Sequence, residues 1–257
     1  MVHAATLSPA GSCQTLEWDS EFFGRRIARV AAKRLDADGW QAVKEFCRDQ
    51  SVECLYFLCD SADQTSIRVA EQAGFDFVDI RLTLERRQDP VVDTCRSVGE
   101  VLRLACLEDV ATLRAIAGVS HRDTRFHVDR HFPPERCDEL YRTWIAKSCQ
   151  GYADAVWVAG PEGRPTGYIT CHIDAPDRGR IGLFAVATEA QGKGLGHQLV
   201  EAALSWLARQ GVARVTVVTQ GRNTPAQRVY QRAGFRTHQV ELWYHRWFQP
   251  ARSEVDR

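Results

Sequence analysis

A glycine-spaced loop between an apolar run and an amphipathic run most constrains how this chain can fold. The loop Gln191–Gly196 follows the apolar run Ile181–Ala187, which favours a strand, and precedes His197–Arg209, which has the periodicity of a helix. We expect its three glycines to take positive φ, so that successive N–H groups converge at the start of the helix. Because the helix dipole favours negative charge at that end, this order of elements predicts an anion site.

Two other phosphate-binding motifs place glycines between a strand and a helix, and both fail on detail here. A P-loop requires Gly-Lys-Ser/Thr, whereas Gly194 and Leu195 follow Lys193. The dinucleotide fingerprint requires an acidic residue about 20 residues further on, at the end of the next strand. The strand expected at Val212–Thr219 is followed by Gln220 instead. After these two motifs are excluded, the pattern of the loop is Gln-x-x-Gly-x-Gly.

A second helix is expected shortly after that strand. Thr224 precedes Pro225, which suits the first helical position, and Gln227 lies three residues after Thr224, as a capping box requires. Gly234 supplies the C-terminal stop. The sequence therefore predicts a helix of about two turns with Thr224 as its N-cap.

The loop and this helix together resemble the acyl-CoA-binding motif of the GCN5-related N-acetyltransferases (GNAT). In that family the strand before the loop splays from its neighbour and pairs with pantetheine, and the loop holds the CoA pyrophosphate. The resemblance implies that Asn223 contacts the cofactor, that Tyr230 protonates the departing thiolate, and that Val186 or its neighbour offers a backbone N–H to the oxyanion. The implied acetyl-CoA-binding residues are Phe184, Ala185, Val186, Gln191, Gly192, Lys193, Gly194, Leu195, Gly196, Asn223 and Tyr230.

Acetyl transfer to an amine requires an unprotonated nitrogen, a polarised thioester and a protonated leaving group. None of the cysteines belongs to a recognisable Cys–His nucleophile motif, so direct attack in a ternary complex is the simpler mechanism. The general base stays open among His172, Asp174, His238 and Glu241, because side-chain direction does not follow from the sequence.

Several further segments narrow the resemblance to the TDP-fucosamine acetyltransferases, over most of residues 14 to 248. These segments are Trp18–Gly24, Thr124–Phe126, Tyr141–Ile145, Val218–Asn223 and Leu242–Arg246. The resemblance implies acetylation of the 4-amino group of dTDP-4-amino-4,6-dideoxygalactose during surface polysaccharide synthesis. Two alternatives stay open: an acetyltransferase for another amine, such as an amino acid, an antibiotic or a protein N-terminus, and a non-catalytic acyl-CoA-binding module.

A nucleotide-sugar acceptor brings a diphosphate and a planar base. Arg122, Arg125 and Arg130 offer forked donors in one loop, and Phe126 offers a stacking face. We therefore predict acceptor binding at these four residues. The alternative is a solvated, charged loop.

The N-terminal third of the chain repeats the pattern of the C-terminal third. Glu71–Arg86 aligns with Gln231–Arg246, and an apolar strand lies about 20 residues before the helix-ending glycine in each copy. In the first copy Ala70 stands where the second has Tyr230, and no glycine loop precedes the helix expected at Trp40–Arg48. This copy is therefore not expected to hold CoA in the same way. Coincidental similarity is the alternative.

The predicted fold class is α/β (α+β), a GNAT fold with a mixed central sheet and flanking helices, preceded by a degenerate GNAT-like half-domain. The domains would be residues 1–92 and 93–257, joined by a linker at Pro90–Val98. In the second domain we expect strands at Val101–Ala105, Ala155–Ala159 and Gly167–Ile173, helices at Glu108–Ala117 and Glu135–Cys149, a loop at Gly118–Pro134 and a turn at Gly160–Gly163.

Composition limits the partners and the compartment. The 33 basic and 33 acidic residues balance, which argues against a broad nucleic-acid surface. There is no apolar run of membrane-spanning length and no signal-peptide pattern, and the nine cysteines form no Cys-x-x-Cys pair. We expect a cytoplasmic protein with reduced thiols. His127 and His131 lack a third ligand at zinc spacing, so no metal is expected, and a homodimer through edge strands stays open.

Overall fold

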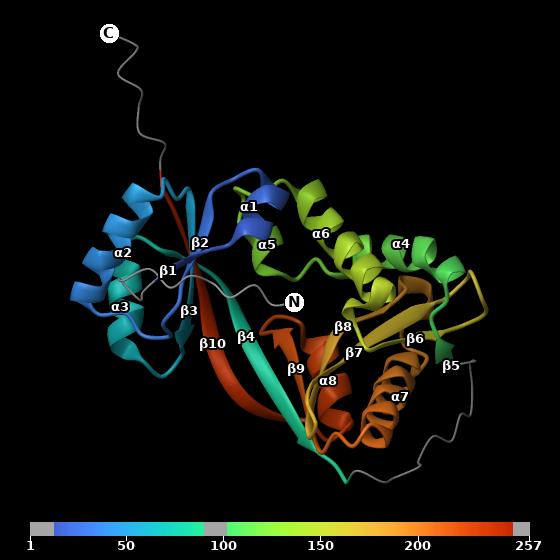
Figure 1. Ribbon diagram of the computed structural model, residues 1–257. Helices are drawn as coiled ribbons and strands as arrows, with labels where there is room; N and C mark the ends of the chain where they lie inside the picture. Colours follow the sequence, from blue (N-terminus) through green and yellow to red (C-terminus); the bar gives the residue numbers. More distant parts are fainter. Residues whose placement is uncertain (1–12, 90–101, 249–257) are drawn as a thin grey trace. The chain divides into compact units, whose positions relative to one another are not determined.

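The computed structural model describes residues 13–89 and 102–248 (Figure 1). The described residues divide into two compact units, one from residues 13–80 and 240–248 and one from residues 81–89 and 102–239. The linker expected at Pro90–Val98, and with it the boundary after residue 92, lie outside the described residues. That boundary stays a prediction.

The first unit combines strands of the sheet with helices. Its elements are β1 (Cys13–Thr15), α1 (Glu17–Phe23), β2 (Ile27–Val30), α2 (Ala37–Asp49), β3 (Cys54–Asp60), α3 (Gln64–Gln72), the start of β4 (Asp76–Arg87) and most of β10 (Arg236–Trp247). The strand order is β1-β2-β3-β10, and β2 and β3 run parallel. Val43 of α2, Leu55 and Phe57 of β3, and Phe75 pack with Tyr244 of β10 into one core.

The second unit contains a mixed sheet in the order β4-β9-β8-β7-β6-β5. Its elements are the end of β4, β5 (Leu102–Leu104), η1 (Leu107–Asp109), α4 (Val110–Ser120), α5 (Arg125–Val128), α6 (Pro134–Lys147), η2 (Ser148–Tyr152), β6 (Ala155–Ala159), β7 (Gly167–Ala175), β8 (Arg178–Val186), η3 (Thr188–Ala190), α7 (Leu195–Arg209), β9 (Arg214–Gln220), α8 (Thr224–Arg232) and the start of β10. The pair β8 and β9 is parallel, whereas its neighbouring pairs are antiparallel.

Helices cover both faces of this sheet, as Figure 1 shows for α4 and α6 against α7 and α8. Alternate residues of β7 explain the two layers, since successive side chains of a strand point to opposite faces. Ile169 and Cys171 pack in the core with Leu199 of α7, whereas Tyr168 bonds to His121 at the end of α4. The predicted mixed sheet with flanking helices is confirmed.

Some sequence-based details of this unit were wrong. The loop expected over Gly118–Pro134 contains the short helix α5, and α4 continues to Ser120. The helix expected to end at Cys149 gives way to a π-helical turn after Lys147, in which Gly151 takes φ 99°. Here the tertiary environment overrides the periodicity of the sequence.

The predicted capping box of α8 was also wrong. Asn223, one residue earlier than expected, is the N-cap, and its side-chain oxygen accepts from the N–H of Ala226 at 3.2 Å. Gln227 instead donates its Nε2 to the carbonyls of Gln220 and Gly221, at 2.9 Å each. An amide oxygen on a short side chain satisfies an orphan N–H at least as well as a threonine hydroxyl does, so Asn223 takes the cap.

The repeat seen in the sequence is visible in the elements. β3, α3 and β4 start at residues 54, 64 and 76, and β9, α8 and β10 start at 214, 224 and 236, each 160 residues later. The last strand of each copy is exchanged: the Arg81–Arg87 part of β4 pairs with β9, and the Glu241–Trp247 part of β10 pairs with β3. The interpretation of the first copy as a degenerate GNAT half-domain stays a prediction.

Candidate active site

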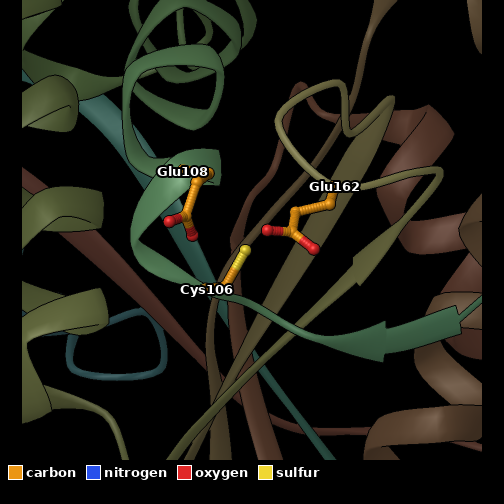
Figure 2. A group of neighbouring side chains, drawn as sticks. All are labelled: Cys106, Glu108 and Glu162. Atoms are coloured by element: carbon orange, nitrogen blue, oxygen red, sulfur yellow. The ribbon is translucent and has the colours of Figure 1, made fainter.

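One group of side chains in the second unit has the composition of a metal site. Ligand atoms of Cys106, Glu108 and Glu162 lie within 4.8 Å of one another (Figure 2). The Cys106 thiol donates to the Asp109 carboxylate at 3.2 Å, and burial together with this bond raises the thiol pKa. Glu108 and Glu162 are exposed, and exposed carboxylates often gather without a metal, so this group alone does not mark the active site. That no metal is bound stays a prediction.

The glycine loop has the backbone conformation that the sequence predicted at two of its three glycines. Gly192 takes φ 77° and Gly194 takes φ 83°, in the region that other residues avoid. Gly196 was predicted wrongly, since it lies inside α7 without positive φ. A Cβ atom at this position would lie 3.1 Å from Cζ of Phe184, so the glycine allows α7 to approach β8 closely.

The first turn of α7 leaves its backbone donors uncapped by any side chain. Gly194 is the N-cap residue and has no side chain to offer. The N–H groups at such a helix start need a partner, and a phosphate satisfies both their hydrogen bonding and the helix dipole. Leu195 is buried and fixes the start of α7, whereas Lys193 is exposed beside it.

The parallel strands β8 and β9 separate next to this loop. Their pairing ends at Ile181 opposite Val217, although β8 continues to Val186 and β9 to Gln220. Beyond Ile181, β8 is paired with β7 and not with β9. The structure therefore contains the splayed strands that the GNAT resemblance implied.

The register of β7 and β8 shows which amides face the gap. The N–H of Ala187 donates to the carbonyl of Thr166 at 2.8 Å, so Val186 and Gly167 form the non-hydrogen-bonded kind of antiparallel pair. By alternation the backbone groups of Phe184 and Val186 point away from β7 into the gap, and those of Ala185 point to β7. The Val186 carbonyl accepts from Nε2 of Gln191 at 3.0 Å, and by the same register its N–H also points away from β7.

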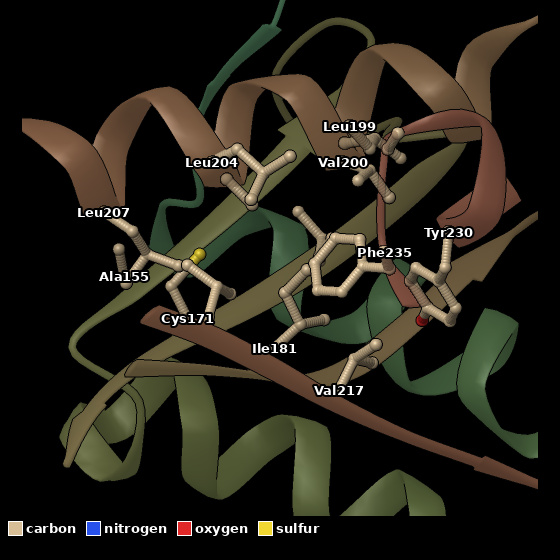
Figure 3. Packing of buried hydrophobic residues seen from close by; sticks show 14 of the residues in the cluster. Ala155, Cys171, Ile181, Leu199, Val200, Leu204, Leu207, Val217, Tyr230 and Phe235 are labelled. Carbon is tan, nitrogen blue, oxygen red and sulfur yellow. The ribbon is translucent and has the colours of Figure 1, made fainter. Parts of the chain in front are cut away.

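Tyr230 lies in the core of the second unit, beside Phe235 (Figure 3). It is 3% exposed, and its ring centroid lies 5.8 Å from that of Phe184 and 5.7 Å from that of Phe235. Burial raises the pKa of the phenol well above its usual value, so the hydroxyl keeps its proton at neutral and alkaline pH. A phenol in this state can donate a proton but is a poor base.

Asn223 caps the start of α8 with its side-chain oxygen and carries an amide NH₂ group that can donate hydrogen bonds. Its Oδ1 is occupied as the helix cap. The Nδ2 group of the same amide carries two donors, which suit a carbonyl or phosphate oxygen of a ligand.

The four residues predicted to bind the acceptor lie on and around α5. Arg122 approaches the Asp138 carboxylate to 3.5 Å, and Arg130 is exposed. Arg125 stacks over the Phe126 ring at 4.1 Å. Phe126 is 4% exposed and packs edge-on against Phe132, so its ring supports Arg125 and offers little open face for a base.

Sequence reasoning missed two buried polar groups in the second unit. His121 bonds to the hydroxyl of Tyr168 at 2.8 Å, and Thr170 of β7 accepts from the N–H of Leu183 at 2.8 Å. Gly182 inside a strand pattern was a signal of a bulge at the second of these places. The contact with His121 is made by residues 47 positions apart and leaves no local pattern.

The first unit has a pocket of about 400 Å³ at the starts of α2 and α3. Its lining residues are Val30, Ala32, Arg34, Leu35, Asp36, Gly39, Asp63, Thr65 and Ser66. Asp36 and Asp63 cap the two helices with their carboxylates, at Gly39 N for α2 and at Thr65 N and Ser66 N for α3. These donors are therefore already satisfied, in contrast to the start of α7.

Comparison with known proteins defines the class. Residues 121–235 match the family model described as the acetyltransferase (GNAT) family, a span that holds the loop, the splayed strands, Asn223 and Tyr230. Residues 121–235 therefore carry the pattern of the GNAT acetyltransferases, and the solved structures described below share the GNAT fold.

Two curated relatives are named for polysaccharide or sugar biosynthesis. The dTDP-fucosamine acetyltransferase of Escherichia coli O6:H1 is 25% identical over 242 residues, which cover 91% of this chain and 98% of that protein. The spore coat polysaccharide biosynthesis protein SpsD of Bacillus subtilis is 27% identical over 139 residues, covering 54% of this chain and 48% of that protein. The match to SpsD therefore spans about half of each protein.

Solved structures support the fold. A functionally unknown conserved protein from Staphylococcus epidermidis superposes with a TM-score of 0.68 at 15% identity, over 97% of this chain and 96% of its own. A GCN5-related N-acetyltransferase from Sphaerobacter thermophilus gives a TM-score of 0.64 at 18% identity, over 96% and 81%. Within residues 13–89 and 102–248, no helix has both the length and the apolar character needed to cross a bilayer.

Proposed function

We propose that this protein transfers the acetyl group of acetyl-CoA to the 4-amino group of a dTDP-linked 4-amino-4,6-dideoxyhexose. The splayed strand β8 carries the proposal, because the N–H groups of Phe184 and Val186 face a gap that ends at the uncapped start of α7. The similarity to dTDP-fucosamine acetyltransferase over 91% of the chain supports this acceptor.

The cofactor would lie along this gap. The pyrophosphate would bind the loop from Gln191 to Gly196 and the first amides of α7, and pantetheine would pair with Phe184 and Val186 in place of a neighbouring strand. The alternation of the register favours these two residues over Ala185 for hydrogen bonds to pantetheine. Asn223 would contribute its Nδ2 donors from the start of α8.

The reaction would be a direct attack in a ternary complex. The neutral amine attacks the thioester carbonyl, and the negative charge that develops on its oxygen is stabilised by the N–H of Val186 or Phe184. As the tetrahedral intermediate collapses, the C–S bond breaks and the sulfur takes the proton of the Tyr230 hydroxyl. The proton lost by the amine restores the phenol through solvent, so the enzyme returns to its starting state.

The diphosphate of the acceptor would bind the arginines around α5. Arg125 lies over the Phe126 ring, and a guanidinium held by such a contact offers a forked set of donors to phosphate oxygens at low entropic cost. Arg122 and Arg130 are exposed and can reach the same anion. We place this reaction in the cytoplasm. The eight cysteines within the described residues are free thiols, which suits a reducing compartment.

The test of the acceptor is acetyl-CoA turnover, followed by release of free thiol. The panel contains dTDP- and UDP-linked 4-amino-sugars, with polyamines, amino acids and peptides as controls. Preference for a dTDP-4-amino-6-deoxyhexose supports the proposal, and Arg125→Gln should then raise the KM for the sugar more than the KM for acetyl-CoA. Turnover of the control amines alone would refute the sugar acceptor and leave the CoA site in place.

Replacement of Tyr230 by Phe tests the chemical step. We expect kcat to fall by about 10²- to 10⁴-fold, the usual contribution of a positioned general acid. The affinity for CoA should change less than about threefold, since the ring keeps its packing against Phe184 and Phe235. Phe235→Tyr, which leaves Tyr230 in place, is the matched control. Unchanged turnover in Tyr230→Phe would refute the role of the phenol.

A further inference from the structure

A β-bulge lies in β8 at the point where that strand leaves its neighbour. In the register of β7 and β8, Ile169 is opposite Phe184 and Cys171 is opposite Ile181. Two residues of β8, Gly182 and Leu183, therefore face the single residue Thr170 of β7. A bulge of this kind bends and twists its strand.

A side chain holds this bulge. The Oγ1 atom of Thr170 accepts the N–H of Leu183 at 2.8 Å, in place of a backbone carbonyl, and Thr170 is fully buried. A Cβ atom on Gly182 would lie 2.6 Å from this oxygen and 2.6 Å from Nε2 of His172. Only glycine therefore leaves room for the hydroxyl and the imidazole beside the bulge.

His172 is the polar neighbour of the Thr170 hydroxyl. Its Nε2 lies 3.5 Å from Oγ1 of Thr170, and the ring also makes a hydrogen bond to the backbone of Tyr152. When the ring carries its proton on Nδ1, Nε2 can accept the hydroxyl proton of Thr170. The Tyr152 ring covers the imidazole edge-on, at 5.5 Å between centroids.

The surroundings keep this imidazole neutral. Burial, and to a smaller extent Arg180 on β8, lower the pKa of His172 to about 4, against the opposing effects of Asp154 and of the bond to Tyr152. A neutral ring can accept from Thr170, whereas a protonated ring would present a donor to the hydroxyl. At neutral pH, the hydrogen bonds that link Tyr152, His172, Thr170 and Leu183 can therefore all form at the same time.

The bulge coincides with the start of the gap. Ile181, the last residue of β8 that pairs with β9, immediately precedes Gly182. The next residue after the clamped Leu183 is Phe184, whose backbone faces the gap.

We propose that Thr170, supported by His172, is a positioning residue that clamps the bulge and thereby aims the amides of Phe184 and Val186 at the acyl-pantetheine. The inference rests on the proposed function, since it assigns these residues to the thioester end of the same cofactor. It predicts that the pantetheine arm and the nucleotide end of CoA respond differently to a change at Thr170, because the loop that would hold the pyrophosphate lies beyond the end of β8.

The test compares Thr170→Val with Thr170→Ser in the full chain. Valine keeps the shape and removes the hydroxyl, whereas serine keeps the hydroxyl. For Thr170→Val we expect kcat/KM for acetyl-CoA to fall by about 10- to 100-fold, as for loss of a buried hydrogen bond that orients the substrate. Affinity for adenosine 3′,5′-bisphosphate, which lacks pantetheine, should stay within about twofold, and Thr170→Ser should keep most of the activity.

His172→Phe provides a second arm. It removes the acceptor of the Thr170 proton, so we expect a smaller loss of kcat/KM than in Thr170→Val, with little further loss when the two changes are combined. Additive losses in the double variant would show that the two residues act separately and would overturn the role of His172.

The remaining outcomes separate this inference from the proposed function. If the unaltered protein binds no CoA, the proposed function fails. If it binds and turns over acetyl-CoA, but Thr170→Val does so equally well, the clamp is refuted. If Thr170→Val does not fold, hydrogen exchange of the unaltered protein decides: the Leu183 amide must be protected like the neighbouring sheet amides, and rapid exchange there would overturn the proposal.

Discussion

The half-buried His121 at the end of α4 gives a prediction about stability that does not depend on function. His121 bonds to the Tyr168 hydroxyl at 2.8 Å and stacks on Tyr141 at 4.7 Å between centroids. Burial, and to a smaller extent His127, lower its pKa from 6.5 to about 4. The unfolded chain therefore binds a proton at a higher pH than the folded protein does.

The sign and size of the effect follow from this difference. A folded-state pKa below the unfolded value means that stability is complete above pH 6.5 and is lost as the pH falls toward 4. Between pH 7.5 and 5 the unfolded state gains a factor of about 30, or about 2 kcal/mol in the free energy of unfolding. His172, with a pKa also lowered to about 4, adds a similar loss.

Urea unfolding at pH 7.5, 6.25 and 5 measures this dependence. The variant His121→Phe with Tyr168→Phe removes the titrating group and its partner, so it should lose about 2 kcal/mol less than the unaltered protein over this range. Tyr168→Phe alone keeps His121 and should keep the steeper dependence, with a constant offset. Identical slopes in the double variant and the unaltered protein would show that His121 is not held neutral by the fold.

Three further predictions concern single contacts. Gly194→Ala should weaken CoA binding and lower the free energy of unfolding by about 1 to 2 kcal/mol, because alanine is strained at the φ of 83° that Gly194 adopts. Calorimetry measures the change in CoA binding, and urea unfolding measures the change in stability. Asp109→Asn breaks a buried pair with Arg103, at 2.6 and 2.8 Å, and should cost about 2 to 4 kcal/mol. Since Arg103 holds the carboxyl pKa well below its usual range, that contribution is present above pH 4 and is lost on further acidification, which an acid titration of both proteins detects. Arg86 and Arg246 each donate a 2.6 Å hydrogen bond to a carbonyl at the end of a helix, and replacement of either by Gln should cost about 1 to 3 kcal/mol of stability. Only Arg86→Gln should also raise the KM for acetyl-CoA, because Arg86 bonds to the end of α8.

The parts of the site that the sequence predicted are those encoded by local backbone preference. Positive φ at Gly192 and Gly194 follows from steric freedom that glycine alone has, and the helix after them follows from its own periodicity. The Asn223 to Tyr230 spacing places both residues on one short helix whatever surrounds it. Local chemistry of this kind needs no knowledge of the rest of the fold.

The parts that the sequence did not predict depend on neighbours far along the chain. Gly196 is required by Phe184, which lies across the packing between α7 and β8, and not by its own φ. The bulge opposite Thr170 depends on the register of two strands. The wrong prediction of Thr224 as the N-cap of α8 was a smaller one. Thr224 and its neighbour Asn223 are both residues that can cap a helix, and in the structure Asn223 does so.

The starts of α3 and α8 occupy equivalent places in the repeat but differ in the residue that caps them. Asp63 at the start of α3 lies 160 residues before Asn223 at the start of α8, and each caps its helix through a side-chain oxygen. Hydrogen bonds from Ser66 lower the pKa of Asp63, so its carboxylate carries a negative charge where a phosphate would approach, and it has no donor to offer. Asn223 is neutral and keeps two N–H groups available after capping. The charge of Asp63 therefore adds to the absence of a glycine loop and to Ala70 in place of Tyr230 as a feature that disfavours an anionic cofactor in the first copy.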